Sequence, residues 1–566
     1  MILVLKNMNS NTNNNNNSIT LLSAAKPPSE SYSTTVAGVS FPSNTTRSSS
    51  SSNSNGNGSS SSQYSASMKT NAASVEIRAP TSSAPSVSES EPISPGVATR
   101  WRELHGSNYW KGLLDPLDAD LRSELIRYGE FSQVTYDSFD HDNHSMFYGS
   151  NRYRKDNLFE KVKHLNTGYE VTHYIYATAD LSMPKLLNLC TAPEAWSRNS
   201  NWMGYVAVCT DEEKIKQLGR RDILIAWRGT IMGTEWAANV QIKLVPSGID
   251  SRPSYNLTTA ALRVEMGFLN LYTSKNSETR YNKTSARQQV LTELKRLIQK
   301  YKGEELSITI TGHSLGSALA TLNAYDIAQS GFNRITDPAA AGAENNNSDE
   351  DWNDSCPIPE NWGDKTADPV RPDKEATIPI AVMSFAGPRV GNNAFCDQLN
   401  ALGVKVLRVV NVNDIVPQVP GILFPPQLSF INKIIDFLPF TYSHAGVQLL
   451  VNNFDSPYLD PKRCNILNCH NLEGYLHVVS GHQGSDGLGK KQQKNSSPSF
   501  TSPPSRDIAL VNKSSNFLKD GHFVPDSWWQ VENKGLVYQV SDGKWIQQTR
   551  DAADVPVPPV RHKKPT

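Results

Sequence analysis

Hydrophobic and polar positions follow two different periods along the middle of the chain. Short apolar runs rich in β-branched residues predict buried strands at residues 204–208, 222–227, 306–311, 378–385 and 404–410. Between some of them, apolar residues recur at helical spacing over residues 285–301 and 317–331. Strands that are apolar throughout and alternate with helices indicate an α/β fold, with a mostly parallel sheet flanked by helices.

The pattern also predicts how the chain is divided. One more helix is expected over residues 118–136, where Leu121, Leu125 and Tyr128 would share an apolar face. Polar, Asn-, Ser- and Pro-rich stretches predict disordered surface insertions near 336–376 and 484–505 and a disordered tail over 549–566. We therefore expect a single folded domain over residues 97–548.

Residues 1–96 cannot bury a core, because Ser, Asn, Thr, Ala and Pro dominate them. The first 75 residues contain four basic residues and one acid, Glu30. A serine-rich, basic and acid-poor start is typical of an organelle transit peptide, and the scarcity of arginine favours a plastid over a mitochondrion. We expect a chloroplast transit peptide and linker here. A disordered tail without a targeting role is the alternative.

Charge and cysteine content narrow the possible functions. The 566 residues include 55 Lys and Arg against 55 Asp and Glu, so no net positive field attracts nucleic acid. Six cysteines are too few for a secreted disulfide framework, and the spacing of Cys464 and Cys469 is not a zinc pattern, so no metal is expected. No apolar run approaches the about 18 residues that a membrane span needs.

The pentapeptide Gly312-His-Ser-Leu-Gly316 matches G-x-S-x-G and lies between a predicted strand and a predicted helix. In this context the motif forms a nucleophile elbow, which exposes Ser314 on a sharp turn. Gly312 and Gly316 would relieve the crowding of that turn, and the following helix N-terminus favours developing negative charge. The strand and helix on either side favour a nucleophile over a chance match.

A serine nucleophile needs a base and an acid, which follow it in the order acid, then histidine. Asp414 comes directly after the strand at 404–410, and His470 precedes the apolar stripe of a predicted helix. His477 lies inside that helix, where packing or a hydrogen bond is the expected role. For the oxyanion, we expect donors at Leu315, after the nucleophile, and at Thr230, after an earlier strand. This chemistry requires no cofactor.

These residues resemble the class 3, or fungal-type, lipases. The strings "LRSELIRYGEFSQVTYDSFD", "GRRDILIAWRGT", "SFAGPRVGN" and "ALVNKSSNFLK" are similar to the plant plastid phospholipase A1 subgroup of class I, gamma type. The resemblance spans roughly residues 98–547. It implies an α/β-hydrolase fold, hydrolysis of sn-1 acyl esters of phospholipids, and a chloroplast location. One departure is Ser317, where the family commonly has glycine, and its side chain is expected to crowd the elbow.

Two stretches are candidates for contact with lipid. The resemblance places a lid at residues 231–246, with Trp236 as its largest apolar side chain, although a core helix is equally compatible. Residues 421–440 are apolar but broken by prolines, which suits an acyl-chain wall or interfacial contact. We expect glycerolipid substrates at a membrane or plastoglobule surface, reached peripherally. The alternatives are a galactolipase, a monoacyl- or triacylglycerol lipase, or a non-catalytic signalling scaffold. Oligomeric state is left open.

Overall fold

The computed structural model describes residues 93, 96–335, 377–484, 500, 504–529 and 536–547, except for gaps at 143–144, 146, 179–200, 231–242, 250–261, 278, 280, 421–440, 540 and 542. Nearly all of the predicted transit peptide and linker, most of the insertion at 484–505, and the whole of the insertion at 336–376 and of the tail lie outside the described residues. Those assignments and the predicted domain limits therefore stay predictions.

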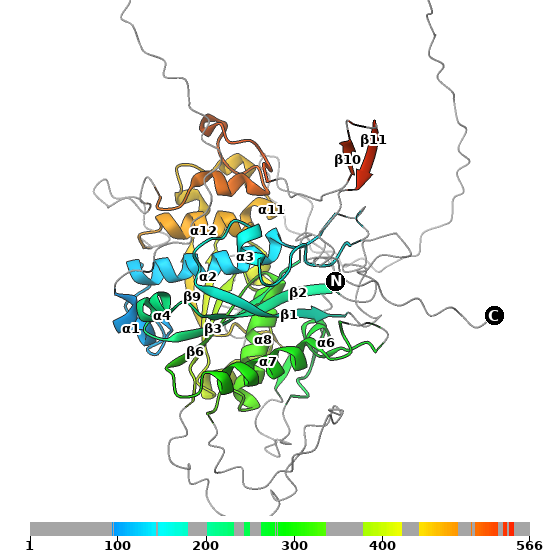
Figure 1. The fold of residues 1–566 in the computed structure, drawn as a ribbon. Helices are drawn as coiled ribbons and strands as arrows, with labels where there is room; N and C mark the ends of the chain where they lie inside the picture. Colours follow the sequence, from blue (N-terminus) through cyan, green and yellow to red (C-terminus); the bar gives the residue numbers. More distant parts are fainter. Residues whose placement is uncertain are drawn as a thin grey trace, which may run out of the picture. The chain divides into compact units, whose positions relative to one another are not determined.

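A seven-stranded sheet forms the centre of the fold (Figure 1). Its spatial order is β1-β2-β3-β6-β7-β8-β9. The five strands from β3 to β9 run parallel, while β1 and β2 are antiparallel to their neighbours at one edge. The bounds are β1 Tyr169–Ala177, β2 Asn201–Cys209, β3 Arg221–Trp227, β6 Leu306–His313, β7 Ile380–Phe385, β8 Lys405–Asn411 and β9 Val447–Val451.

The fold class predicted from the sequence is confirmed, and the five predicted strands correspond to β2, β3, β6, β7 and β8. All seven residues of β3 are buried, because helices cover both of its faces. The sequence analysis missed the two outermost strands. Strand β1 is only partly buried. Strand β9 is five residues long, and its first residue is half-buried and its second exposed. Because polar residues occupy the exposed positions, neither strand has a continuous apolar run.

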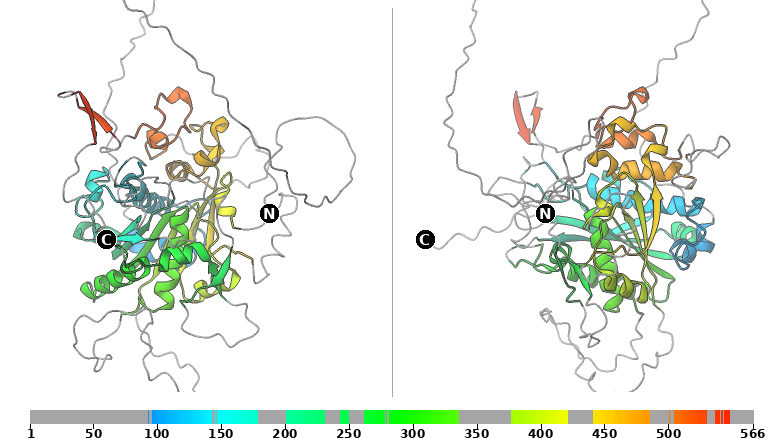
Figure 2. Two further views of the ribbon diagram at one scale, coloured as in Figure 1. Left: turned by 90° about the vertical axis from the view of Figure 1, so that its right-hand side faces the viewer. Right: turned by 180° about the vertical axis from the view of Figure 1, so that it is seen from behind.

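Helices cover the sheet on both faces, as Figure 1 shows and Figure 2 repeats from two other directions. On one face lie α1, α2 and α12, and on the other lie α6, α7, α8 and α9. Their bounds are α1 Val97–Leu104, α2 Ala119–Asp137, α6 Met266–Thr273, α7 Ala286–Lys300, α8 Leu315–Gln329, α9 Asn393–Ala401 and α12 Leu472–Gly481. In the part of the chain that the structure describes, every helix is too short or too polar to cross a membrane.

Shorter elements complete the described fold. Two small antiparallel sheets have two strands each: β4 (Leu244–Pro246) pairs with β5 (Arg263–Glu265), and β10 (Leu536–Gln539) pairs with β11 (Lys544–Gln547). The short α-helices are α3 Leu158–Lys161, α4 Glu212–Leu218 and α11 Ile466–Cys469. The 3-10 turns are η3 Val416–Gln418, η5 Asn453–Asp455, η6 Pro461–Arg463, η7 Ile508–Lys513 and η8 Asp520–His522.

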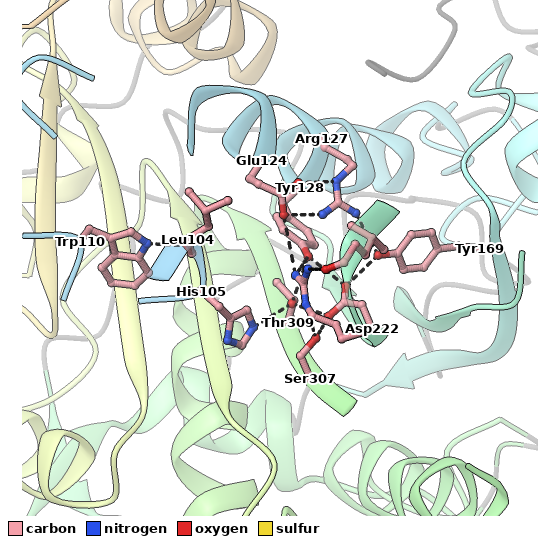
Figure 3. Close-up of polar contacts among 12 residues, drawn as sticks. Leu104, His105, Trp110, Glu124, Arg127, Tyr128, Tyr169, Asp222, Ser307 and Thr309 are labelled. Carbon is pink, nitrogen blue, oxygen red and sulfur yellow. Dashed lines mark hydrogen bonds and ion pairs between the residues drawn. The ribbon is translucent and has the colours of Figure 1, made fainter. Parts of the chain in front are cut away.

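A buried charged network joins α2 to the sheet (Figure 3). Asp222, at the start of β3, accepts hydrogen bonds from Tyr128 and Tyr169 on one carboxylate oxygen, at 3.0 and 2.8 Å. Its other oxygen accepts from Ser307 and Thr309 of β6, at 2.6 and 2.7 Å. Four hydroxyl donors from three parts of the chain therefore meet at one carboxylate.

Two arginines balance the charge of this network. Arg127 forms a two-point ion pair with Glu124, at 3.1 and 2.6 Å, and also donates to the Tyr169 hydroxyl. Arg220 donates to Ser307 and to Tyr128. Burial by itself would raise the pKa of Asp222, but the two arginines and the hydroxyl donors outweigh it and lower that pKa. The aspartate is therefore ionised, and its charge holds α2 on β3 and β6.

We predict that Asp222→Ala lowers the free energy of unfolding by about 3–5 kcal/mol, since it leaves two buried arginines with one carboxylate. Urea denaturation followed by circular dichroism measures this. Because the folded-state pKa of Asp222 is lowered, its contribution is present at neutral pH and is lost as pH falls through that pKa, so the difference from wild type should shrink in acid.

The matched control is Asp156→Ala, which removes an exposed carboxylate paired with Arg154. Its loss should stay below about 1 kcal/mol at every pH. Equal losses for the two variants would contradict an anchoring role for Asp222.

Candidate active site

Ser314 occupies a strained position between β6 and α8, with φ 59° and ψ −127°. Such angles cost a non-glycine residue on the order of 1–3 kcal/mol, and they are retained where the surrounding structure enforces them. The glycines of the motif supply that constraint. A Cβ on Gly312 would lie 2.4 Å from the Gly316 backbone, and a Cβ on Gly316 would lie 2.3 Å from the Trp227 carbonyl oxygen. The turn therefore has the geometry of a nucleophile elbow, with the buried Ser314 at its apex.

Ser317 stands where the family that the sequence resembles commonly has glycine. Its side chain does not have the crowding effect that was expected. The Ser317 hydroxyl lies 2.5 Å from the Gly312 carbonyl oxygen and 3.0 Å from the Phe385 carbonyl oxygen. It thus shares its proton between the ends of β6 and β7. The side chain that was expected to crowd the elbow connects it to the next strand.

Asp414 and His470 meet directly, although they lie 56 residues apart. The Nδ1 atom of His470 is 2.7 Å from Asp414 Oδ2, which also accepts a hydrogen bond from the Tyr475 hydroxyl at 2.6 Å. The Val416 N–H donates to the other carboxylate oxygen at 2.9 Å. Since a carboxylate accepts, the proton of the neutral imidazole lies on Nδ1, and Nε2 is the basic nitrogen.

Local structure fixes His470 at the joint between α11 and α12. Cys469, directly before it, is joined to Cys464 by a disulfide, a pairing that the sequence analysis did not predict. Asn411, at the end of β8, donates from its side chain to the Cys469 carbonyl at 3.0 Å. His477 lies within α12 and is 2.7 Å from the Ser456 hydroxyl, and this matches the supporting role expected for it.

His313 brings the loop of His470 to the elbow. Its Nε2 atom lies 2.8 Å from the His470 carbonyl oxygen, and the two rings lie 4.6 Å apart between centroids. Burial lowers the pKa of His313 well below its ordinary value, and the nearby His470 adds to this. Because His313 precedes Ser314, this contact places the backbone of His470 beside the serine.

The predicted oxyanion residues lie at the same elbow. Leu315 is the first residue of α8, so its N–H has no helical acceptor. Thr230 follows Gly229, and a Cβ on Gly229 would lie 3.3 Å from the Ser314 Cβ. Arg228 holds this loop, since it donates to the Gly229 and Trp202 carbonyls at 2.8 and 2.9 Å. Burial lowers the pKa of Arg228 to about 10.

Three buried polar atoms at this place have no hydrogen-bond partner among the described residues. They are Ser314 Oγ, His470 Nε2 and Thr230 Oγ1. Buried polar atoms are normally paired, so a cluster of unpaired ones next to a strained turn is typical of a site that a substrate completes. The arrangement can transfer an acyl group: a hydroxyl, a neutral imidazole with its basic nitrogen free, and backbone N–H groups near the serine.

The sequence analysis missed some residues of this site, and one residue that it did predict lies outside the described part of the chain. Tyr475 lies in the helix predicted after His470, where no site role was expected for it, and His313 occupies an unspecified position of the motif. Tyr136 belonged to a predicted helix, and nothing in its spacing indicates a contact with His313. Trp236 lies outside the described residues, so its role in a lid stays a prediction. The last residues of the predicted lid form β4.

Comparison with known proteins identifies the family. The pattern of the family described as Lipase (class 3) matches residues 224–344 and 366–424. Phospholipase A1-Igamma3, chloroplastic, from Arabidopsis thaliana is 42% identical over 80% of this chain and 77% of its own length. Phospholipase A1-II 6 from Oryza sativa subsp. japonica is 40% identical over 81% of this chain and 97% of its own length.

Among solved structures, the Lip2 lipase of Yarrowia lipolytica matches at 16% identity over 65% of this chain and 93% of that chain, with a TM-score of 0.34. The assignment rests on the sequence relatives. Since the two plant relatives are 42% and 40% identical over 80% and 81% of its length, the chain belongs to the class 3 lipase family of serine ester hydrolases.

Proposed function

We propose that this class 3 lipase is a phospholipase A1, which cleaves the sn-1 acyl ester of glycerophospholipids through a covalent acyl-enzyme. The observation that carries the mechanism is the hydrogen bond from His470 Nδ1 to Asp414, which leaves the basic Nε2 unpaired in the same buried site as Ser314. The names of the plant relatives support the substrate class.

In the proposed reaction, Ser314 Oγ attacks the ester carbonyl while His470 Nε2 accepts the serine proton. Asp414 stabilises the imidazolium, and the N–H groups of Leu315 and Thr230 stabilise the oxyanion. The C–O bond of the ester breaks, and His470 returns the proton to the departing lysophospholipid oxygen. Water then attacks the acyl-serine by the same route and releases the fatty acid. No step requires a metal or cofactor.

Removal of single side chains tests this mechanism. Ser314→Ala and His470→Ala should each lower the rate of fluorophosphonate labelling and of ester hydrolysis by about a thousandfold or more, because the groups act as a unit. His477→Ala is the matched control, since it removes a buried imidazole that bonds Ser456 instead. Circular dichroism must show that each variant folds. Near-normal labelling of folded His470→Ala, with a silent His477→Ala, would show that the base was assigned wrongly.

A panel of lipids tests the substrate. Vesicles or micelles of phosphatidylcholine, galactolipid and triacylglycerol, each labelled in a single acyl chain, are incubated with the purified protein. We expect release of the sn-1 acyl chain of the phospholipid at least about tenfold faster than release of the sn-2 chain. Faster cleavage of the galactolipid or of triacylglycerol would replace phospholipase A1 by one of those activities, while the ester-hydrolase mechanism would stand.

We also propose that the protein acts in the chloroplast. The acid-poor N-terminal composition and the names of the Arabidopsis relatives support this location. Protein recovered from isolated chloroplasts should have a new N-terminus within residues 50–97, which N-terminal sequencing would detect. Recovery of the intact chain from the cytosol alone would contradict the proposal.

A further inference from the structure

The hydroxyl of Tyr136 lies between two parts of the proposed active site. Tyr136 is close to the end of α2, and its Oη atom is 2.7 Å from His313 Nδ1. The same oxygen lies 3.4 Å from the His313 carbonyl oxygen and packs against Gly229. A Cβ on Gly229 would lie only 2.1 Å from that oxygen, so the contact needs a glycine. Gly229 precedes the oxyanion residue, and His313 precedes the serine.

The direction of each proton follows from the partners. The His470 carbonyl oxygen can only accept, so the His313 Nε2 atom beside it carries the proton. His313 Nδ1 is then bare and accepts the hydroxyl proton of Tyr136. Burial keeps the pKa of His313 well below its ordinary value, so the ring stays neutral, and burial raises the pKa of Tyr136, so the phenol keeps its proton.

This chain of hydrogen bonds determines which tautomer His313 adopts. In the other tautomer Nε2 would present a lone pair to the His470 carbonyl oxygen, and that contact would be repulsive rather than bonding. Loss of the Tyr136 hydroxyl removes one of the two contacts that favour the bonding tautomer and leaves only the His470 carbonyl oxygen to favour it. It also removes the oxygen that packs against Gly229. Both the backbone of His470 and the loop before Thr230 would then be less firmly held against Ser314.

We propose that Tyr136 is a positioning residue for ester hydrolysis: through His313 and Gly229 it holds the base and the oxyanion loop in register with the serine. The proposal rests on the Ser314–His470–Asp414 mechanism proposed above. Two contacts hold α2 on either side of Tyr136. The next residue, Asp137, is 2.5 Å from Lys513 Nζ, and Tyr128, earlier in the helix, bonds Asp222.

The first test replaces Tyr136 by phenylalanine, which keeps the ring and removes the hydroxyl. On a soluble short-chain p-nitrophenyl ester, kcat should fall about 10- to 100-fold with KM changed less than about threefold, since the loss is one of alignment. The rate of fluorophosphonate labelling should fall in proportion to kcat. The KM-against-kcat split separates positioning from a general loss of folded protein.

Tyr205→Phe is the matched control. The Tyr205 hydroxyl, on β2, is also buried and donates at 2.8 Å to the carbonyl of Phe131 in α2, a residue outside the proposed site. This variant should retain kcat within about twofold of wild type, even if its melting temperature falls. Both variants are assayed at a temperature where circular dichroism shows them folded. Equal kcat losses in the two variants would overturn the proposal in favour of a purely structural role.

A second test leaves Tyr136 in place and changes His313. His313→Gln offers an amide N–H near the position of Nε2, and His313→Asn offers one near Nδ1, so the glutamine variant should retain at least about tenfold more activity. Glutamine has no tautomer to select. The cost of Tyr136→Phe should therefore be several-fold smaller in the His313→Gln background than in wild type, a coupling that a double-mutant cycle measures.

Further results would decide against the proposal, and they can be told apart. A kcat for Tyr136→Phe within twofold of wild type would overturn the positioning role of Tyr136 and leave the acyl-enzyme mechanism standing. Losses of kcat that are fully additive between Tyr136→Phe and His313→Gln would have the same consequence. Failure of the wild-type protein to be labelled at Ser314 would overturn the acyl-enzyme mechanism and this inference with it.

Discussion

The backbone of Ser314 sets the constraint on which the site depends. Its positive φ turns the chain sharply from β6 into α8, and the turn closes only because Gly312, Gly316 and the Trp227 carbonyl approach one another within distances that exclude a Cβ. That approach brings the ends of β3, β6 and α8 together. The helix N-terminus, the loop before Thr230 and the serine consequently lie at a single place, where the proposed mechanism puts the developing oxyanion.

The second requirement is a rigid support for α2, which lies across the sheet. Its middle is held by Asp222 and the paired arginines, and its end by Lys513. Tyr128, which bonds Asp222, and Tyr136, which bonds His313, are eight residues apart, or about 12 Å along a helix. The charged network at one end of β3 and the elbow at the other are thus connected through one helix. This connection explains why so many charges are buried far from the proposed chemistry.

Much of this architecture could be predicted from the sequence, because it follows from local patterns. Apolar runs predicted the central strands, and the motif around Ser314 needs only its strand and helix to be recognised. Asp414 and His470 were predicted from their places after a strand and before a helix, and the structure brings them within a hydrogen bond. The strands were predictable because each has a continuous apolar run, and the positions of Asp414 and His470 were predictable because each adjoins a predicted strand or helix.

Contacts between distant elements could not be predicted in the same way. Tyr136 and Tyr475 occupy positions that fit the apolar pattern of their helices. Nothing in the local sequence therefore distinguishes them from residues that only pack. The disulfide between Cys464 and Cys469 depends on how α11 folds, so it could not be predicted. Ser317 was expected to crowd the elbow, but its hydroxyl bonds the ends of two strands there. Edge strands such as β1 have no continuous apolar run in the sequence, because part of their surface is exposed to solvent.

The central claim is that Ser314 forms the covalent intermediate. Peptide mapping by mass spectrometry, after reaction of the folded protein with a fluorophosphonate, tests this most directly. The account predicts a single phosphonyl group, carried by the peptide that contains Ser314 and assigned by fragmentation to that serine. A phosphonyl group on another residue, or no modification of catalytically active protein, would contradict it.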